Sequence, residues 1–144
     1  DSFENLANSE NTSASIYTYL AQAYAGAENY EQAEETFNTA LEEYPENWEL
    51  RLNFGNYYAD REMQDKAIDN YKQASELAGE NFYAHYKLFM AFNNIGASKE
   101  AEQEMQKITE IQQNMEGPQP ETEQPSDASS IEEELEQTKP DNNN

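Results

Sequence analysis

The chain has 144 residues, of which 30 are acidic and eight are basic, so its net charge near neutral pH is −22. A charge of this size repels the phosphates of nucleic acids and the anionic surfaces of membranes, so neither is a predicted partner. The absence of cysteine excludes disulfide bonds and thiolate metal sites, and no apolar run approaches the roughly 18 residues of a membrane-spanning helix, so no direct membrane insertion is predicted.

Apolar residues follow the spacing of an α-helix in six segments that cover most of the chain. In the first segment Tyr17, Ala21 and Tyr24 fall on one helix face, and in the second Ala33 and Phe37 do the same. Glycines, a proline or polar runs separate the segments, as expected for turns between helices. After an N-terminal extension at 1–13, the predicted helices are 14–26, 30–43, 48–60, 64–77, 82–94 and 98–114.

Residues suited to capping helix N-termini precede four of these helices. Ser13, Asn47 and Asn81 each offer a side-chain oxygen to the first unpaired N–H groups of the helix that follows. Asn29 with Gln32 resembles a capping box for the helix at 30–43, in which both side chains bond to backbone N–H groups. Capping and periodicity therefore predict the same helix starts.

The pattern recurs every 34 residues. Ala33, Ala67 and Ala101 show this spacing. The other positions that repeat with it are Tyr17, Arg51 and His85; Leu20, Phe54 and Leu88; Ala21, Gly55 and Phe89; Tyr24, Tyr58 and Phe92; and Phe37, Tyr71 and Met105. The period defines three units, 14–47, 48–81 and 82–115, and a period of this length indicates stacked pairs of helices.

These residues resemble the pattern of the tetratricopeptide repeat family. The first unit matches it nearly completely, through Tyr17, Leu20, Ala21, Tyr24, Ala33, Phe37, Ala40 and Pro45. The later units depart from the pattern at Arg51 and Gly79, and then at His85, Phe89, Met105, Ile108 and Gln113. The resemblance implies an all-α fold, a right-handed superhelical solenoid of three antiparallel helix pairs.

Small and aromatic residues are predicted to form the core. Ala21, Gly55 and Ala67 let neighbouring helices approach closely, and larger side chains fill the space beside them. The predicted core side chains are Tyr17, Tyr24, Phe37, Phe54, Tyr58, Tyr71, Leu88 and Phe92.

Residues 116–144 differ in composition from the repeats. They hold nine acidic residues, one basic residue and four of the five prolines of the chain. Such a segment does not bury enough apolar surface to offset the entropy lost on ordering. We predict an acidic, proline-rich disordered tail, with a short helix at 129–138 as a candidate element.

The sequence offers few residues for catalysis. It contains one histidine and no cysteine, and it lacks a phosphate-binding loop, a dinucleotide fingerprint and an HExxH zinc motif. His85 stands where the repeat buries an aromatic residue, so we expect it to pack in the core rather than to act as a ligand or base. The chain is predicted not to be an enzyme, with no catalytic residues, no cofactor and no metal. A hydrolase is the enzymatic alternative, and the residues for it are missing.

The resemblance also implies where a partner binds, because stacked helix pairs present their first helices on a concave face. The residues predicted to line this face are Thr18, Tyr19, Gln22, Leu52, Asn53, Asn56, Tyr83, Tyr86, Lys87 and Met90. Amides and tyrosines with little charge favour an extended peptide. The predicted function is a non-enzymatic scaffold or adaptor for a protein or peptide partner. The alternative interpretation is that the amides only keep an exposed face soluble.

The two ends of the chain indicate a second function. After residue 115 the chain continues into a proline-rich segment instead of the polar capping helix that repeat arrays use. Phe3 with Leu6 and Ile131 with Leu135 are apolar pairs at helical spacing, and these four residues are candidates for end contacts. The alternative function is a structural subunit that self-associates head to tail through an uncapped repeat. The pairs are otherwise parts of flexible ends.

Composition gives only a weak indication of the compartment. Few lysines, many acidic, Asn and Tyr residues and a start without methionine favour a processed bacterial protein outside the cytoplasm, periplasmic or secreted. A cytoplasmic location is the alternative.

Overall fold

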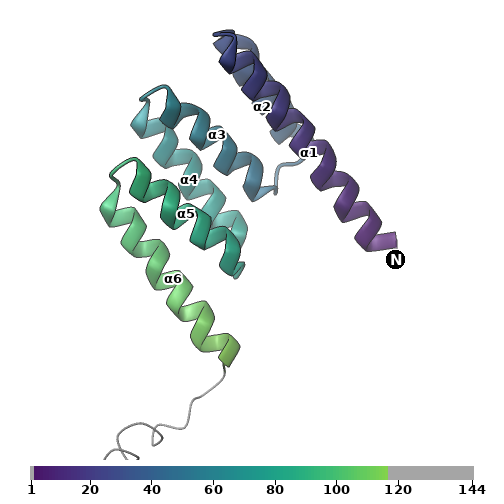
Figure 1. Cartoon of the computed structure of the whole chain (residues 1–144). Helices are drawn as coiled ribbons and strands as arrows, with labels where there is room; N and C mark the ends of the chain where they lie inside the picture. Colours follow the sequence, from purple (N-terminus) through teal and green to yellow (C-terminus); the bar gives the residue numbers. More distant parts are fainter. Residues whose placement is uncertain (1, 117–144) are drawn as a thin grey trace, which may run out of the picture. The chain divides into compact units, whose positions relative to one another are not determined.

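The computed structural model describes residues 2–116, with side chains for residues 9–115. These residues form six α-helices and no strand (Figure 1). The helices are α1 (Ser2–Gly26), α2 (Tyr30–Glu43), α3 (Trp48–Asp60), α4 (Gln64–Ala78), α5 (Phe82–Asn94) and α6 (Ser98–Glu116). The all-α class and the three helix pairs are therefore confirmed. The predicted disordered tail at 116–144, with the candidate helix 129–138 and with Ile131 and Leu135, lies outside the described residues apart from the end of α6.

The helices pack against one another within one compact unit that ends at residue 112. The helix α1 packs on α2, α3 packs on α4, and α4 packs in turn on α5. First helices also contact one another, since α3 touches both α1 and α5. The first helices α1, α3 and α5 therefore form a continuous row, which is the arrangement that the candidate site needs.

The turns inside the three pairs share one backbone geometry. Glu28, Glu62 and Gly96 all have positive φ angles, of 63°, 59° and 76°, and they are 34 residues apart. A residue in this left-handed conformation ends an α-helix, and glycine adopts it with the least strain. The second helices consequently begin at the same spacing, at Tyr30, Gln64 and Ser98.

The first helix is longer than its sequence pattern predicted. We expected a start at 14 with Ser13 as the N-cap, and this is wrong because α1 begins at Ser2 and runs to Gly26. Residues 2–13 contain neither proline nor glycine, so nothing in their backbone chemistry stops the helix. Ser13 therefore lies inside the helix.

The predicted asparagine caps have different outcomes. The side chains of Asn47 and Asn81 each accept a hydrogen bond at 3.1 Å, from the N–H groups of Leu50 and Ala84, so these two caps are confirmed. The capping box at Asn29 is wrong, because this side chain makes no capping hydrogen bond. The N–H of Asn29 instead donates to the carbonyl of residue 24 at 2.8 Å, and that bond already uses the donor that the box would satisfy.

Most of the predicted core is buried. Phe37, Phe54, Tyr58, Tyr71, Leu88 and Phe92 are buried, and Tyr17 and Tyr24 are partly buried against the same cluster. Leu20 and Met105, which the helical pattern placed among the apolar positions, are instead 44% and 41% exposed. For Leu20 the reason is that α1 packs on α2 and α3, which leaves its other side to solvent.

Aromatic side chains join each pair of helices to the next one. The rings of Phe37 on α2 and Phe54 on α3 stack with their centroids 4.8 Å apart. Tyr71, the counterpart of Phe37 in the second unit, meets Phe92 on α5 edge to face at 5.4 Å. Such contacts add to the free energy of burying the rings. Aromatic contacts therefore hold both junctions between successive pairs, although the two contacts differ in ring geometry and use different repeat positions on the first helices.

Gly55 allows a close contact between α3 and α4 in the core. A Cβ atom at this position would lie 2.5 Å from Cε1 of Tyr71 and 3.3 Å from the carbonyl oxygen of Ala67. Real carbon atoms do not approach this closely, so α3 and α4 pack at their observed separation only with glycine here.

We predict that Gly55→Ala lowers the free energy of unfolding by about 1 to 3 kcal/mol, because the added methyl group overlaps the Tyr71 ring. Gly26→Ala is the matched control, since a Cβ at Gly26 meets nothing within 4 Å, and its stability should be unchanged or slightly higher. Urea denaturation followed by circular dichroism measures both. Equal stability of the two variants would show that the contact at Gly55 is not tight.

Tyr71 should make the fold sensitive to alkaline pH. Burial raises the pKa of Tyr71 from 10.0 to about 12, and the charge of Asp60 adds to the effect. Because the folded state holds the proton more tightly than the unfolded state, this contribution to stability is complete below pH 10 and is lost as the pH rises toward 12.

We therefore expect the parent chain to lose more unfolding free energy than Tyr71→Phe between a pH of about 9 and a pH of about 11. Urea denaturation at both pH values measures the difference. Tyr57 and Tyr58, whose pKa values burial also raises, titrate in both proteins and do not affect the comparison. Identical losses in the two proteins would contradict the role of Tyr71.

Candidate functional site

The predicted site residues lie on the row of first helices, α1, α3 and α5. Among them, Tyr19, Tyr83, Tyr86 and Met90 are the large side chains that remain open to solvent, with exposed fractions of 69%, 56%, 48% and 48%. The amides of Gln22 and Asn56 are exposed, and the side chains of Asn53 and Lys87 are partly exposed. Eight of the ten predicted residues are thus available to a partner.

Two of the predicted residues are not on the surface. Thr18 and Leu52 are only 6% and 5% exposed, so the expectation that they present open side chains is wrong. The Thr18 hydroxyl donates to the carbonyl of Ala14 at 3.3 Å and accepts from Nδ2 of Asn53 at 3.5 Å, and Leu52 belongs to the apolar core. The hydrogen bond between Thr18 and Asn53 holds the Asn53 amide of α3 close to α1.

The residues of α1 and α3 surround two adjoining pockets. The first has a volume of about 190 Å³, and Thr18, Tyr19, Gln22 and Asn53 are among the residues that line it. The second has a volume of about 340 Å³ and shares Gln22 and Asn53 with the first, while Asn56 also lines it. The structure therefore brings together five of the six predicted residues of the first two units, all except the buried Leu52, in one groove, which we call the α1–α3 groove.

The predicted residues of α5 have a different setting. Tyr83 lines a third pocket of about 550 Å³ together with Trp48 and Asn81. The rings of Trp48 and Tyr83 meet edge to face with their centroids 6.3 Å apart. Tyr86 and Met90 follow Tyr83 along α5 at helical spacing and are exposed, so they extend the aromatic surface beyond this pocket.

Sequence reasoning missed three residues that shape these pockets. Trp48 lines the third pocket, and Arg61 and Tyr30 line the second. The Arg61 guanidinium carbon lies 3.9 Å from the centroid of the Tyr30 ring, and its Nη1 donates to the Tyr57 hydroxyl at 3.0 Å. Trp48 had a signal in the sequence, as the one tryptophan of the chain directly after an N-cap. The Arg61 contacts depend on how the turns fold and had none.

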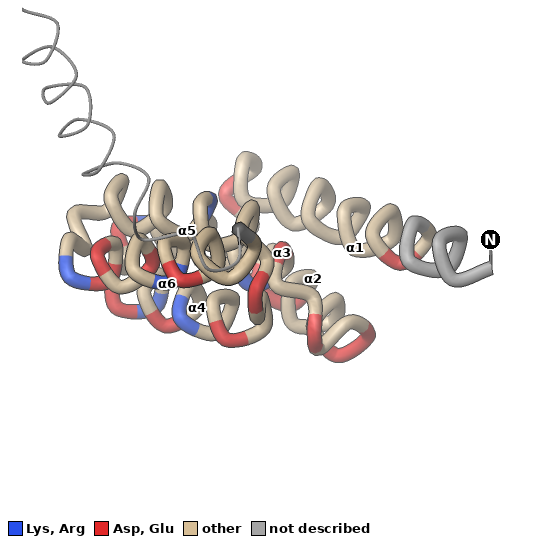
Figure 2. The backbone as a smooth tube through the Cα atoms, turned by 90° about the horizontal axis from the view of Figure 1, so that it is seen from below, with Lys and Arg blue, Asp and Glu red and all other residues tan. Residues whose placement is uncertain are grey.

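The first helices carry much less charge than the second ones. Figure 2 shows that most of α1 is free of charged residues, whereas charged residues recur along α2, α4 and α6. The sequence of α5 contains one charged residue, Lys87, besides His85. The α1–α3 groove and the exposed face of α5 therefore present mainly amides and aromatic rings, whereas four glutamates line the pocket beside Trp48 and Tyr83.

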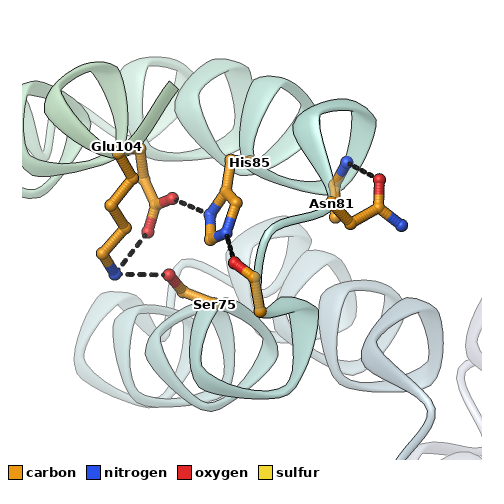
Figure 3. A network of polar contacts seen from close by, with 7 residues as sticks. Ser75, Asn81, His85 and Glu104 are labelled. Carbon is orange, nitrogen blue, oxygen red and sulfur yellow. Dashed lines mark hydrogen bonds and ion pairs between the residues drawn. The ribbon is translucent and has the colours of Figure 1, made fainter. Parts of the chain in front are cut away.

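His85 takes part in a buried polar network that joins α4, α5 and α6 (Figure 3). Its ring is 1% exposed, its Nε2 lies 2.7 Å from the carbonyl oxygen of Gly79, and its Nδ1 lies 2.7 Å from Oε2 of Glu104. Lys107 donates to the Ser75 hydroxyl at 2.7 Å and lies 3.6 Å from the Glu104 carboxylate.

The hydrogen-bond partners of His85 limit where hydrogens can lie in this network. The carbonyl of Gly79 can only accept, so Nε2 carries a hydrogen, and the contact between Nδ1 and Glu104 needs a further hydrogen on one of its two atoms. Both ring nitrogens are thus used inside the fold. The expectation that His85 packs in the core agrees with this geometry.

Residues 2–116 contain no group of three or more His, Cys, Asp or Glu side chains arranged to hold a metal ion. In the same part of the chain no helix is both long and apolar enough to span a bilayer.

Residues 14–47 match the sequence model of the tetratricopeptide repeat family. The chain thus contains a tetratricopeptide repeat in its first unit, and two further helix pairs of the same spacing follow it. Its fold is that of a scaffold for protein–protein interactions.

Solved structures of two mutants of the protein MamA are similar to this chain. The first is 23% identical with a TM-score of 0.47, and the alignment covers 69% of this chain and 72% of the other. The second is 24% identical with a TM-score of 0.47 and covers 76% of this chain and 58% of the other. No curated protein sequence matches the chain.

We predict that Glu104→Ala lowers the free energy of unfolding by about 1 to 3 kcal/mol, because it leaves Nδ1 of His85 buried without a partner. Glu110→Ala is the control, since Glu110 lies on the same helix and is exposed, and it should change stability by less than about 0.5 kcal/mol. Urea denaturation at neutral pH measures both. Equal stabilities would mean that the network does not hold α6 in place.

Proposed function

We propose that the chain is a non-enzymatic scaffold that binds an extended peptide segment of a partner protein along its first helices. The observation that carries the proposal is the α1–α3 groove, in which Gln22 and Asn53 line two adjoining pockets. The exposed aromatic side chains of Tyr83 and Tyr86 continue this surface on α5.

The chemistry of the groove suits an extended backbone. A peptide that is not in a helix or sheet has unpaired N–H and C=O groups, and the amide of an Asn or Gln side chain offers both a donor and an acceptor to them. Tyrosine rings supply large contact areas at a small cost in side-chain entropy. The amides would therefore bind the peptide backbone, while Tyr19, Tyr83 and Tyr86 would contact its side chains.

Panning a display library of random peptides tests this proposal without a known partner. We expect a set of peptides that the chain retains and that the variant Tyr19→Ala, Gln22→Ala, Tyr86→Ala no longer binds. The control Asn38→Ala, Gln103→Ala, Gln106→Ala removes three exposed polar side chains from α2 and α6 and should retain the peptides. The proposal is wrong if no peptide is enriched, or if the groove variant binds as well as the parent.

One observation favours self-association as a second candidate function. Ile16 and Leu20 expose 60% and 44% of their surfaces on α1, and Met105 exposes 41% on α6. Such side chains on the first and last helices could be covered by another copy, since a head-to-tail contact pairs different surfaces. The candidate end contacts Phe3 and Leu6 have side chains outside the described residues. Sedimentation of the parent and of Ile16→Gln, Leu20→Gln separates this function, because only the parent should self-associate.

A further inference from the structure

The aromatic surface on α5 has no partner within the described residues. Tyr83, Tyr86 and Met90 fall three and four residues apart, so they share one helix face, and about half of each side chain is exposed. Trp48 from α3 extends this face at the N-terminal end of α5, where its ring meets that of Tyr83. An uncovered row of large side chains on a charge-poor helix is the kind of surface that a partner covers.

The charged residues that line the pocket at one end of this surface are all acidic. The pocket beside Trp48 and Tyr83 has a volume of about 550 Å³, and four glutamates contribute to its lining: Glu10 from α1, and Glu43, Glu46 and Glu49 from the end of α2 to the start of α3. No lysine or arginine is among the residues that line it. An aromatic wall with carboxylates around it is complementary to a cation.

Cationic side chains of the chain itself already lie near its tyrosine rings. The guanidinium of Arg61 lies over the ring of Tyr30, and Nζ of Lys87 lies 5.1 Å from the centroid of Tyr83. Lys87 belongs to α5 and is not among the residues that line the pocket. The four carboxylates of the pocket thus lack a basic side chain lining the same space.

We infer that the partner segment is basic, and that one of its arginines enters the pocket between Trp48, Tyr83 and the glutamates. This inference rests on the proposed function, whose partner it specifies. Arginine fits better than lysine because its planar guanidinium stacks on aromatic rings and bonds two carboxylate oxygens at once. The rest of the segment continues along Tyr86 and Met90.

Charge also argues against the other occupants of this surface. Residues 116–144 hold nine acidic residues and one basic residue, and a second copy of the chain brings a net charge of −22. Either one would place carboxylates against carboxylates, which is unfavourable over short distances. A basic segment of another protein is the occupant that the charges support.

Trp48 provides a direct readout, because it is the one tryptophan of the chain and its ring borders the pocket. The peptides retained in the display experiment are resynthesised with each arginine replaced by citrulline, which keeps the shape of the side chain and removes its charge. Both versions are titrated at several salt concentrations while Trp48 fluorescence is followed. We expect arginine to be enriched among the retained peptides, and citrulline to weaken binding by at least about tenfold.

Two charge-matched variants separate the pocket from the general acidity of the protein. Glu10→Gln, Glu46→Gln, Glu49→Gln removes three charges at the pocket, and Glu35→Gln, Glu76→Gln, Glu110→Gln removes three exposed charges elsewhere. The first variant should bind the arginine and citrulline peptides with nearly equal affinity. The second should keep the parent's preference for arginine.

The outcomes distinguish the two levels of the proposal. Retained peptides without an arginine preference, or equal losses in both variants, would overturn the basic partner and leave the peptide-binding function standing. A constant Trp48 signal during saturable binding would likewise overturn the pocket assignment. If no peptide binds at all, the proposed function fails and this inference fails with it.

Discussion

The close contact between Gly55 and the ring of Tyr71 is the constraint on which the middle of the structure depends. The contact sets the separation of α3 and α4, the two helices of the second pair. The same ring meets Phe92 on α5, so the Tyr71 side chain also joins the second pair to the third. Its hydroxyl donates to Oδ1 of Asn56 at 2.6 Å, and Asn56 lines the α1–α3 groove. A core contact thus also orients an amide of the candidate site. Burial of Tyr71 serves packing and positioning together, because an aromatic ring with a polar end can satisfy both.

Repetition explains why so much of the fold could be predicted from the sequence. The 34-residue period locates most of the small and aromatic core residues, and the caps Asn47 and Asn81 mark helix starts independently. Before the first unit, where the repeat pattern ends, the capping chemistry of Ser13 predicted a helix start that the structure does not have. The helix α1 continues back to Ser2 since residues 2–13 contain no helix-breaking residue, and Leu20 stays exposed because no other helix of residues 2–116 covers that side of α1.

The candidate site was predictable in its location and less so in its detail. Periodicity assigns residues to the first helices, but it does not reveal depth, so Thr18 was placed on the surface although it lies beneath it. The pocket at Trp48 combines α1, the turn after α2, α3 and the start of α5. Such a combination follows from tertiary packing, and no short stretch of sequence contains it. The first helices carry less charge than the second ones, and this is the one property of the site that can be read equally well from the sequence and from the structure.

The central claim is that a partner peptide lies along the row formed by α1, α3 and α5. The most direct measurement is the change in backbone amide NMR shifts when a peptide retained by the chain is titrated into the isotope-labelled protein. The predicted result is a set of shifts on these three helices around Gln22, Asn53 and Tyr86, with little change on the outer residues of α2, α4 and α6. Shifts concentrated on the second helices would contradict the claim.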